Sequence, residues 1–162
     1  MPETALTLLF VCTGNTCRSP MAEVIARALV AERGLSPHVT VRSAGIAADE
    51  ASGASEGSLL VAMEHGLDLS RHRSRQLDRA TVQASDLVLT MGPSHLAAVR
   101  ELGGEAKAAL LSDYATHGES ARPVSDPIGG ELPVYRATYD ELRTLIARAL
   151  DRWLAERPLR AS

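Results

Sequence analysis

The sequence predicts an α/β fold, a single three-layer domain in which a four-stranded parallel sheet carries helices on both faces. Short apolar runs typical of buried strands alternate with segments whose apolar residues recur at helical spacing. Turn-forming residues separate these segments, and no linker, repeat or low-complexity tract divides residues 1–162. At 162 residues the chain is long enough to bury a core without help from disulfides or metals.

The first expected unit is a strand, a helix and a second strand. Residues 6–11 form a nearly continuous apolar run, which predicts a central strand buried on both faces. The apolar positions of residues 21–33 have helical spacing, and Gly34 is expected to end that helix. Residues 39–44 alternate and are rich in β-branched side chains, so they predict a second strand that completes a right-handed unit.

The middle of the chain predicts further alternation of helices and strands. Gly66 ends the first of the later helices, and Pro93 suits the first turn of another. The expected elements, in order, are a loop (45–57), a short helix (58–65), a second short helix (78–84), a third strand (87–91), a helix (93–102) and a weaker fourth strand (108–111).

A long loop and a closing helix complete the chain. Residues 112–133 contain several Pro and Gly residues and form a longer loop than a compact domain usually keeps without a functional reason. We therefore expect an active-site loop there. Beyond it, an apolar stripe from Tyr139 to Trp153 predicts a helix that runs to about Glu156 and is ended by Pro158.

Composition excludes several classes of function. The formal net charge is −3 with both signs interspersed, so no basic patch for nucleic acid is expected. No apolar run approaches the roughly 20 residues that span a bilayer, and no signal sequence is evident, so we expect a cytoplasmic protein without a membrane partner. Two closely spaced cysteines do not predict a disulfide scaffold.

Metal and cofactor binding are not expected either. A structural zinc site would need further Cys or His residues at matching spacing. The histidines are scattered, and each is interpreted as a surface or packing residue: His38, His65, His72, His95 and His117.

Residues 12–20 (CTGNTCRSP) carry the most informative pattern. They lie between the first strand and the first helix, where free backbone N–H groups and the helix dipole favour an anion. Ser19 is expected to be the N-cap and Pro20 the first helical residue. Gly14 and Asn15 are expected to tolerate the left-handed backbone that lets consecutive N–H groups converge on one oxyanion.

Cys12 and Arg18 have the residue types that phosphoryl transfer to a thiolate needs. The helix dipole, the loop amides and a guanidinium would all stabilise a Cys12 thiolate, the reactive form of cysteine. Arg18, six positions later, can bind two phosphate oxygens with its planar fork of donors. The loop has no Gly-Lys-Ser/Thr ending, which excludes a Walker-type phosphate loop.

The pattern Cys-x5-Arg-Ser after a buried strand resembles the signature loop of low-molecular-weight protein tyrosine phosphatases, and the likeness extends to the last helix. The resemblance implies that Cys12 is the nucleophile, that Arg18 clamps the phosphate and that Asp126, followed by Pro127, is the general acid. It also implies a set of phosphate-binding and supporting residues. These are Thr13, Gly14, Asn15, Thr16, Cys17 and Ser19, with Ser43 hydrogen-bonded to Asn15 and Ser19 steadying the thiolate.

Two positions favour one subtype of this family. Thr16 stands where tyrosine-specific members usually carry a bulky aliphatic residue, and residues 128–130 (IGG) replace the usual aromatic residues. In both respects the chain is similar to bacterial protein-arginine phosphatases, which implies a phosphorylated protein as substrate. A phosphoarginine group is rich in N–H donors, which the Thr16 hydroxyl and the Asp126 carboxylate could accept. By the resemblance, Thr16 also helps to place the hydrolytic water.

Several alternatives stay open. Tyrosine phosphatase activity is the first alternative. Arsenate reductase is disfavoured because that activity, by resemblance, needs further cysteines near residues 80–95, and a phosphoprotein-binding module would need neither nucleophile nor acid. Cys17 either packs beneath the loop or traps oxidised Cys12 as a disulfide. Arg42 and Arg122 are interpreted as surface residues, and the sequence leaves the protein substrate and the oligomeric state open.

Overall fold

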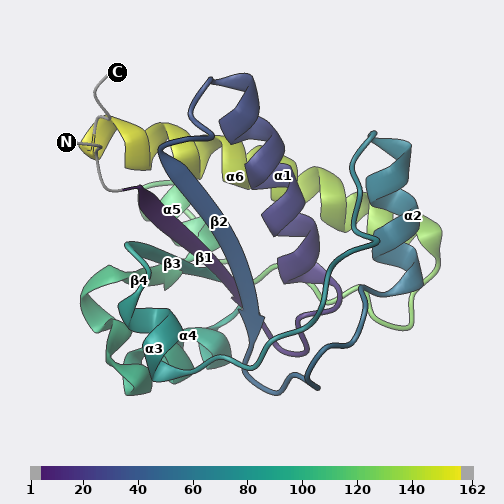
Figure 1. The fold of residues 1–162 in the computed structure, drawn as a ribbon, viewed down its shortest axis with the longest axis horizontal. Helices are drawn as coiled ribbons and strands as arrows, with labels where there is room; N and C mark the ends of the chain where they lie inside the picture. The colour runs from purple at the N-terminus through teal and green to yellow at the C-terminus, as the bar shows by residue number, and fades with distance from the viewer. Residues whose placement is uncertain (1–4, 158–162) are drawn as a thin grey trace.

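A parallel four-stranded sheet in the order β2-β1-β3-β4 lies at the centre of the fold (Figure 1). The computed structural model describes residues 5–157. The strands are β1 (Leu6–Cys12), β2 (Val39–Gly45), β3 (Leu87–Thr90) and β4 (Ala108–Leu110). β1 pairs with β2 along its whole length and with β3 on its other side, so the first strand is central, as its apolar run predicted.

Helices cover both faces of this sheet, which confirms the three-layer prediction. Alternate residues of β1 point to opposite layers, with Leu8 and Phe10 in one buried cluster and Leu9 and Val11 in the other. The helices are α1 (Arg18–Glu32), α2 (Glu56–Glu64), α3 (Arg79–Gln83), α4 (Pro93–Val99), α5 (Leu111–Ala115) and α6 (Leu132–Glu156), with a π-helical turn at Arg100–Gly104 and a 3-10 turn at Glu105–Lys107.

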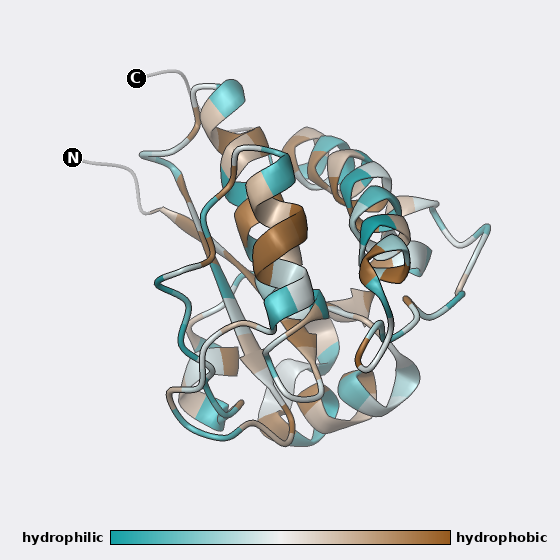
Figure 2. Cartoon of the chain, turned by 90° about the vertical axis from the view of Figure 1, so that its right-hand side faces the viewer, coloured by the Kyte–Doolittle hydropathy of each residue, from teal (hydrophilic) through white to brown (hydrophobic). Residues whose placement is uncertain are grey.

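The two apolar clusters separate the helices into layers. The larger cluster joins β1 to α1, α2, α5 and α6, and the smaller one joins β1 and β3 to α3 and α4. In Figure 2 the apolar residues lie mainly along strands and helices, and the connecting loops are mostly pale or polar. No helix within residues 5–157 is long and apolar enough to cross a membrane.

Most expected elements are confirmed, and two boundaries are corrected. α1 begins at Arg18 rather than near residue 21. The expected loop 112–133 begins with helix α5, because Leu111 and Ala115 are both buried one helical turn apart and anchor a short helix. Pro158, expected to end the closing helix, lies outside the described residues.

The loop from 116 to 131 returns across the carboxyl ends of the strands. The Val124 N–H donates to the Met91 carbonyl at 2.9 Å, just after β3. Val124 and Pro127 are buried, whereas Asp126 between them is exposed. This anchoring places Asp126 at the sheet edge where β1 ends and α1 begins, the edge at which open α/β folds bind ligands.

Candidate active site

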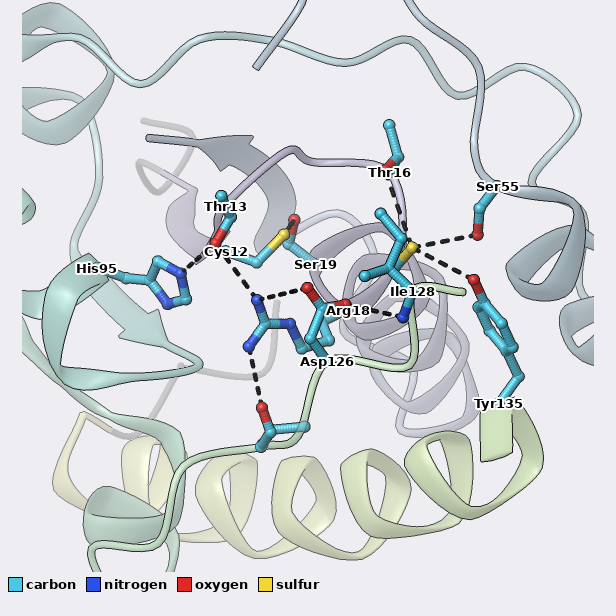
Figure 3. Close-up of polar contacts among 12 residues, drawn as sticks. Cys12, Thr13, Thr16, Arg18, Ser19, Ser55, His95, Asp126, Ile128 and Tyr135 are labelled. Carbon is cyan, nitrogen blue, oxygen red and sulfur yellow. Dashed lines mark hydrogen bonds and ion pairs between the residues drawn. The ribbon is translucent and has the colours of Figure 1, made fainter. Parts of the chain in front are cut away.

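The Cys12 thiol lies at the end of β1 and is buried, with 2% of its residue surface exposed. Its Sγ is 2.8 Å from Ser19 Oγ (Figure 3). Asn15 Nδ2 donates to the same Ser19 oxygen, also at 2.8 Å. Because that oxygen already accepts a bond, the Ser19 proton is free to point at the sulfur, where it stabilises a thiolate.

Ser19 does not have the capping role expected from the sequence. Cys17 is the N-cap of α1, no side chain caps the helix, and Ser19 and Pro20 lie inside its first turn. The Ser19 hydroxyl is occupied by Cys12 and Asn15, so it is unavailable to a backbone N–H. The prediction that Ser19 caps the helix is therefore wrong, and its hydroxyl contacts the Cys12 thiol instead.

Asn15 is the residue that bends the loop. It has φ +57° and is fully buried, and its side chain donates to Ser43 Oγ at 2.9 Å, which confirms the expected contact. Gly14 is not among the residues with positive φ, so only one of the two residues expected to adopt left-handed backbone does so. The Asn15 side chain offsets this strain with hydrogen bonds that an unbranched apolar residue could not make.

Residues distant in the sequence form hydrogen bonds with Asn15. Asn15 Oδ1 accepts from the Arg75 N–H at 2.9 Å, and the Asn15 carbonyl oxygen is 2.7 Å from His72 Nε2. Ser43 in turn donates to Glu23 Oε1 at 2.8 Å. The sequence interpretation of His72 as a surface or packing residue missed this contact, because no local pattern places residue 72 beside the loop.

The loop passes so close to β2 that only glycine fits at one position. A Cβ added to Gly45 would lie 2.4 Å from the Thr13 carbonyl oxygen and 2.9 Å from the Asn15 nitrogen. The backbone N–H groups of residues 14–17 donate no hydrogen bond to any acceptor within residues 5–157. These donors, at the amino end of a 15-residue helix, form an anion-binding arrangement.

Arg18 projects from the first turn of α1 into the centre of the site, and its side chain is 9% exposed. Nη1 donates to the Val124 carbonyl oxygen at 2.9 Å, and Nη2 donates to Thr13 Oγ1 at 3.4 Å (Figure 3). Nε is buried and has no hydrogen-bond partner within residues 5–157. With Nη1 anchored on Val124, the edge formed by Nε and Nη2 faces the site. This edge matches two oxygens of a phosphate.

Asp126 approaches Arg18 from the 116–131 loop. Its Oδ2 is 3.6 Å from Arg18 Nη2, and its Oδ1 accepts from the Ile128 N–H at 3.1 Å. The side chain is 39% exposed, so it contacts both the cation and solvent. A carboxyl group in this position can exchange a proton with a group bound above the loop.

Cys17 is the last residue of the loop before α1, and its side chain points away from this centre. Its Sγ is 3.3 Å from Ser55 Oγ and 3.6 Å from the Tyr135 hydroxyl, and Thr16 Oγ1 lies 3.8 Å from the same sulfur. Both cysteines are free thiols. Packing beside the loop accounts for Cys17 in this structure, and a disulfide with oxidised Cys12 stays a prediction.

His95 is a second histidine that the sequence interpretation did not place at the site. It lies in the first turn of α4, is 3% exposed, and holds its Nε2 2.9 Å from Thr13 Oγ1. Burial, followed by the charge of Arg18, lowers the pKa of His95 to about 4, and Asp126 opposes that shift. The signal available in the sequence was its position just after the third strand, at the same sheet edge as Cys12.

Three elements thus bring a thiol, a guanidinium and a carboxylate together in one polar site (Figure 3). Cys12 ends β1, Arg18 begins α1, and Asp126 comes from a loop more than a hundred residues later. Such a site can bind a tetrahedral anion, form a covalent bond from sulfur and supply a proton to a leaving group.

Comparison with known proteins gives matches over nearly the whole chain. The family model described as low molecular weight phosphotyrosine protein phosphatase matches residues 7–158. A protein-arginine-phosphatase of Geobacillus stearothermophilus is 40% identical over 149 residues, covering 92% of this chain and 97% of the relative. The low molecular weight protein-tyrosine-phosphatase Wzb of Salmonella typhi is 33% identical and covers 90% of each chain.

The fold is also similar to that of solved structures. A YwlE arginine phosphatase structure that carries a phosphorylated active-site serine superposes with a TM-score of 0.86 at 35% identity. The superposition covers 94% of this chain and 98% of that one.

Proposed function

The chain belongs to the low molecular weight phosphotyrosine protein phosphatase family, and we propose that it is a cysteine-dependent protein phosphatase acting on phosphoarginine in proteins. The observation that carries the proposal is the joint placement of Cys12, Arg18 and Asp126 around the free N–H groups of the loop. Each of the three has the chemistry that one part of phosphoryl transfer requires.

In the first proposed step the Cys12 thiolate attacks phosphorus, and the bond from phosphorus to the leaving nitrogen breaks. Arg18 binds two phosphoryl oxygens through Nε and Nη2, while Nη1 stays on the Val124 carbonyl. Asp126 gives its proton to the departing guanidine nitrogen, so that arginine leaves as a stable cation. The loop amides stabilise the charge on the equatorial oxygens.

In the second proposed step water hydrolyses the phosphorylated cysteine. Asp126, now a carboxylate, takes a proton from the water that attacks phosphorus. The sulfur leaves as a thiolate, and the Ser19 hydroxyl, 2.8 Å away, donates to it as negative charge returns. The cycle ends with inorganic phosphate and needs no metal or cofactor.

The preference for phosphoarginine is supported by the rim of the site. Ile128 is 66% exposed and is followed by two glycines, so this segment offers no aromatic face. Tyr135 is 5% exposed, and its hydroxyl contacts Cys17, so its ring is not presented for stacking either. Thr16 instead offers a hydroxyl that can accept from the N–H groups of a guanidinium.

Tyrosine phosphatase activity is the second candidate, since a relative with that name is 33% identical over 90% of this chain. The discriminating experiment compares kcat/KM on phosphoarginine and phosphotyrosine peptides of the same sequence. We expect the wild type to prefer phosphoarginine and Thr16→Ile to shift that preference towards phosphotyrosine. A wild type with a strong preference for phosphotyrosine would refute the arginine assignment while leaving the phosphatase assignment intact.

The proposed partner is a phosphorylated protein, and neither nucleic acid nor a membrane has a part in the reaction. We propose a cytoplasmic site of action, because the nucleophile must be kept reduced and both Cys12 and Cys17 are free thiols.

A further inference from the structure

Within residues 5–157, only one of the two ring nitrogens of His95 is within hydrogen-bond distance of another residue. The residue is 3% exposed, and its Nδ1 has no hydrogen-bond partner within residues 5–157. A buried polar atom without a partner destabilises the folded state, because it loses its hydrogen bonds to water and gains none in return. An apolar side chain would avoid that cost, so the value of histidine here has to lie in its other nitrogen, Nε2, which is 2.9 Å from Thr13 Oγ1.

The contact between Thr13 and Arg18 decides which residue donates in the hydrogen bond between Thr13 and His95. Thr13 Oγ1 accepts from Arg18 Nη2 at 3.4 Å. A hydroxyl oxygen that accepts from a cation has its own proton free to donate. The imidazole is neutral at neutral pH, because burial and the Arg18 charge lower its pKa to about 4. A neutral ring has one acceptor nitrogen, and Nε2 is the one within reach of Thr13.

We propose that His95 is a positioning residue for Arg18: it accepts the Thr13 proton at Nε2 and thereby keeps the Thr13 oxygen turned towards the guanidinium. The chain of donors runs from Arg18 to Thr13 to His95, and it leaves the His95 proton on Nδ1. The inference rests on the proposed function in one respect only, namely that Arg18 binds the phosphoryl group.

Two hydrogen bonds orient the planar guanidinium, and the exposed Asp126 carboxylate, 3.6 Å from Nη2, adds an ion pair. The Val124 carbonyl holds Nη1 at 2.9 Å, and Thr13 holds Nη2 from the far side of the loop. With both in place, the edge formed by the unpartnered Nε and by Nη2 is held in one orientation. If Thr13 lost its acceptor at His95, its proton could turn towards Arg18 and the second hydrogen bond would be lost. The guanidinium would then pivot about Val124, away from the phosphate oxygens.

The tautomer can be read directly in the wild-type chain. Nitrogen-15 chemical shifts of the His95 ring distinguish a protonated from an unprotonated nitrogen. We expect Nδ1 protonated and Nε2 unprotonated at pH 7. A protonated Nε2 would overturn the proposal, whether or not the protein proves to be a phosphatase.

The energetic test is a double-mutant cycle with His95→Phe, Thr13→Val and the double variant, scored by inhibition with inorganic phosphate. We expect each single change to weaken phosphate binding about tenfold and the double change to be no worse than the larger single effect, because both remove the same link. His95→Gln, which restores an acceptor, should recover most of the affinity. His65→Phe, an exposed histidine stacked on Tyr139, is the matched control and should bind phosphate as the wild type does.

Vanadate separates positioning of Arg18 from a general effect on the fold. Vanadate adopts the trigonal-bipyramidal geometry of the transferred phosphoryl group, so a misplaced guanidinium should cost more vanadate affinity than phosphate affinity. Equal losses for the two anions, or additive losses in the cycle, would overturn the role of His95 alone. A wild type that binds neither anion would overturn the proposed function and this inference with it.

Discussion

Arg18 Nη2 lies 3.6 Å from Asp126 Oδ2, so the proposed phosphate clamp and the proposed general acid contact each other across the site. The contact joins the start of α1 to the 116–131 loop and holds the Asp126 carboxylate close to the Arg18 guanidinium. A phosphoryl group bound to Arg18 would therefore hold its leaving group beside the Asp126 carboxyl. Only the Arg18 side chain of this pair is buried, since it is 9% exposed and the Asp126 side chain is 39% exposed.

Replacing Asp126 with Asn should slow turnover in proportion to how much the leaving group needs a proton. Loss of a general acid typically costs about 10²–10⁴-fold. We expect a loss in that range for phosphoarginine peptides and a loss below about tenfold for an activated aryl phosphate. Steady-state kinetics on both substrates measure the difference, and equal losses on the two would contradict the acid role.

Cys12→Ser should abolish turnover and leave phosphate binding in place. The hydroxyl keeps the size of the side chain, but it lacks the nucleophilicity of a thiolate at neutral pH. The loop amides and Arg18 are unchanged, so inorganic phosphate should bind within about threefold of the wild type. Calorimetry and rate measurements test the two halves separately. Cys17→Ser is the comparison, and turnover that survives in Cys12→Ser but not in Cys17→Ser would show that the nucleophile is misassigned.

The central features of the fold and site could be predicted because their signals are local. The apolar run at 6–11 is followed at once by Cys12 and Arg18, so strand, loop and helix are contiguous. Asp126 is identified by the resemblance, because Asp126-Pro127 matches the general-acid motif of the family and lies in a loop whose length already predicts a functional role.

The remainder depends on contacts between distant residues. His72 and His95 reach Asn15 and Thr13 from 57 and 82 residues away, and neither lies in a pattern that marks a ligand. Ser19 looked like a helix cap because capping and thiol contacts use the same hydroxyl, and only the position of Cys12 decides between them. Helix α5 was missed because five residues carry too little periodicity to predict a helix.

The buried His95 should make the folded state lose stability as the pH falls. Its pKa is lowered from 6.5 to about 4 by burial first and the Arg18 charge second. Below pH 6.5 the unfolded chain binds a proton that the folded chain does not, so the contribution to stability is full above 6.5 and is lost down to about pH 4.

Chemical denaturation of the wild type and His95→Phe between pH 4 and 7 measures this contribution. The difference between the two proteins should change by about 3 kcal/mol across that range, since the pKa falls from 6.5 to about 4 and each pKa unit corresponds to about 1.4 kcal/mol. The comparison cancels the carboxylates that titrate in both. A difference that stays constant with pH would mean that His95 titrates normally.

Gly45→Ala should disturb the loop although the residue contacts no substrate. The new Cβ would lie 2.4 Å from the Thr13 carbonyl oxygen and 2.9 Å from the Asn15 nitrogen, both of them backbone atoms that cannot swing away. Gly45 also pairs with Cys12 in the sheet, so its shift would be passed to the start of the loop. Overpacking of this kind costs about 1–3 kcal/mol of stability.

Because Asn15 must keep its left-handed backbone for the N–H groups to converge, we expect inorganic phosphate binding in Gly45→Ala to fall by tenfold or more. Gly53→Ala is the matched control, since a Cβ there meets nothing within 4 Å and φ is not positive. Phosphate binding that survives in Gly45→Ala at wild-type strength would show that the loop geometry does not depend on this contact with β2.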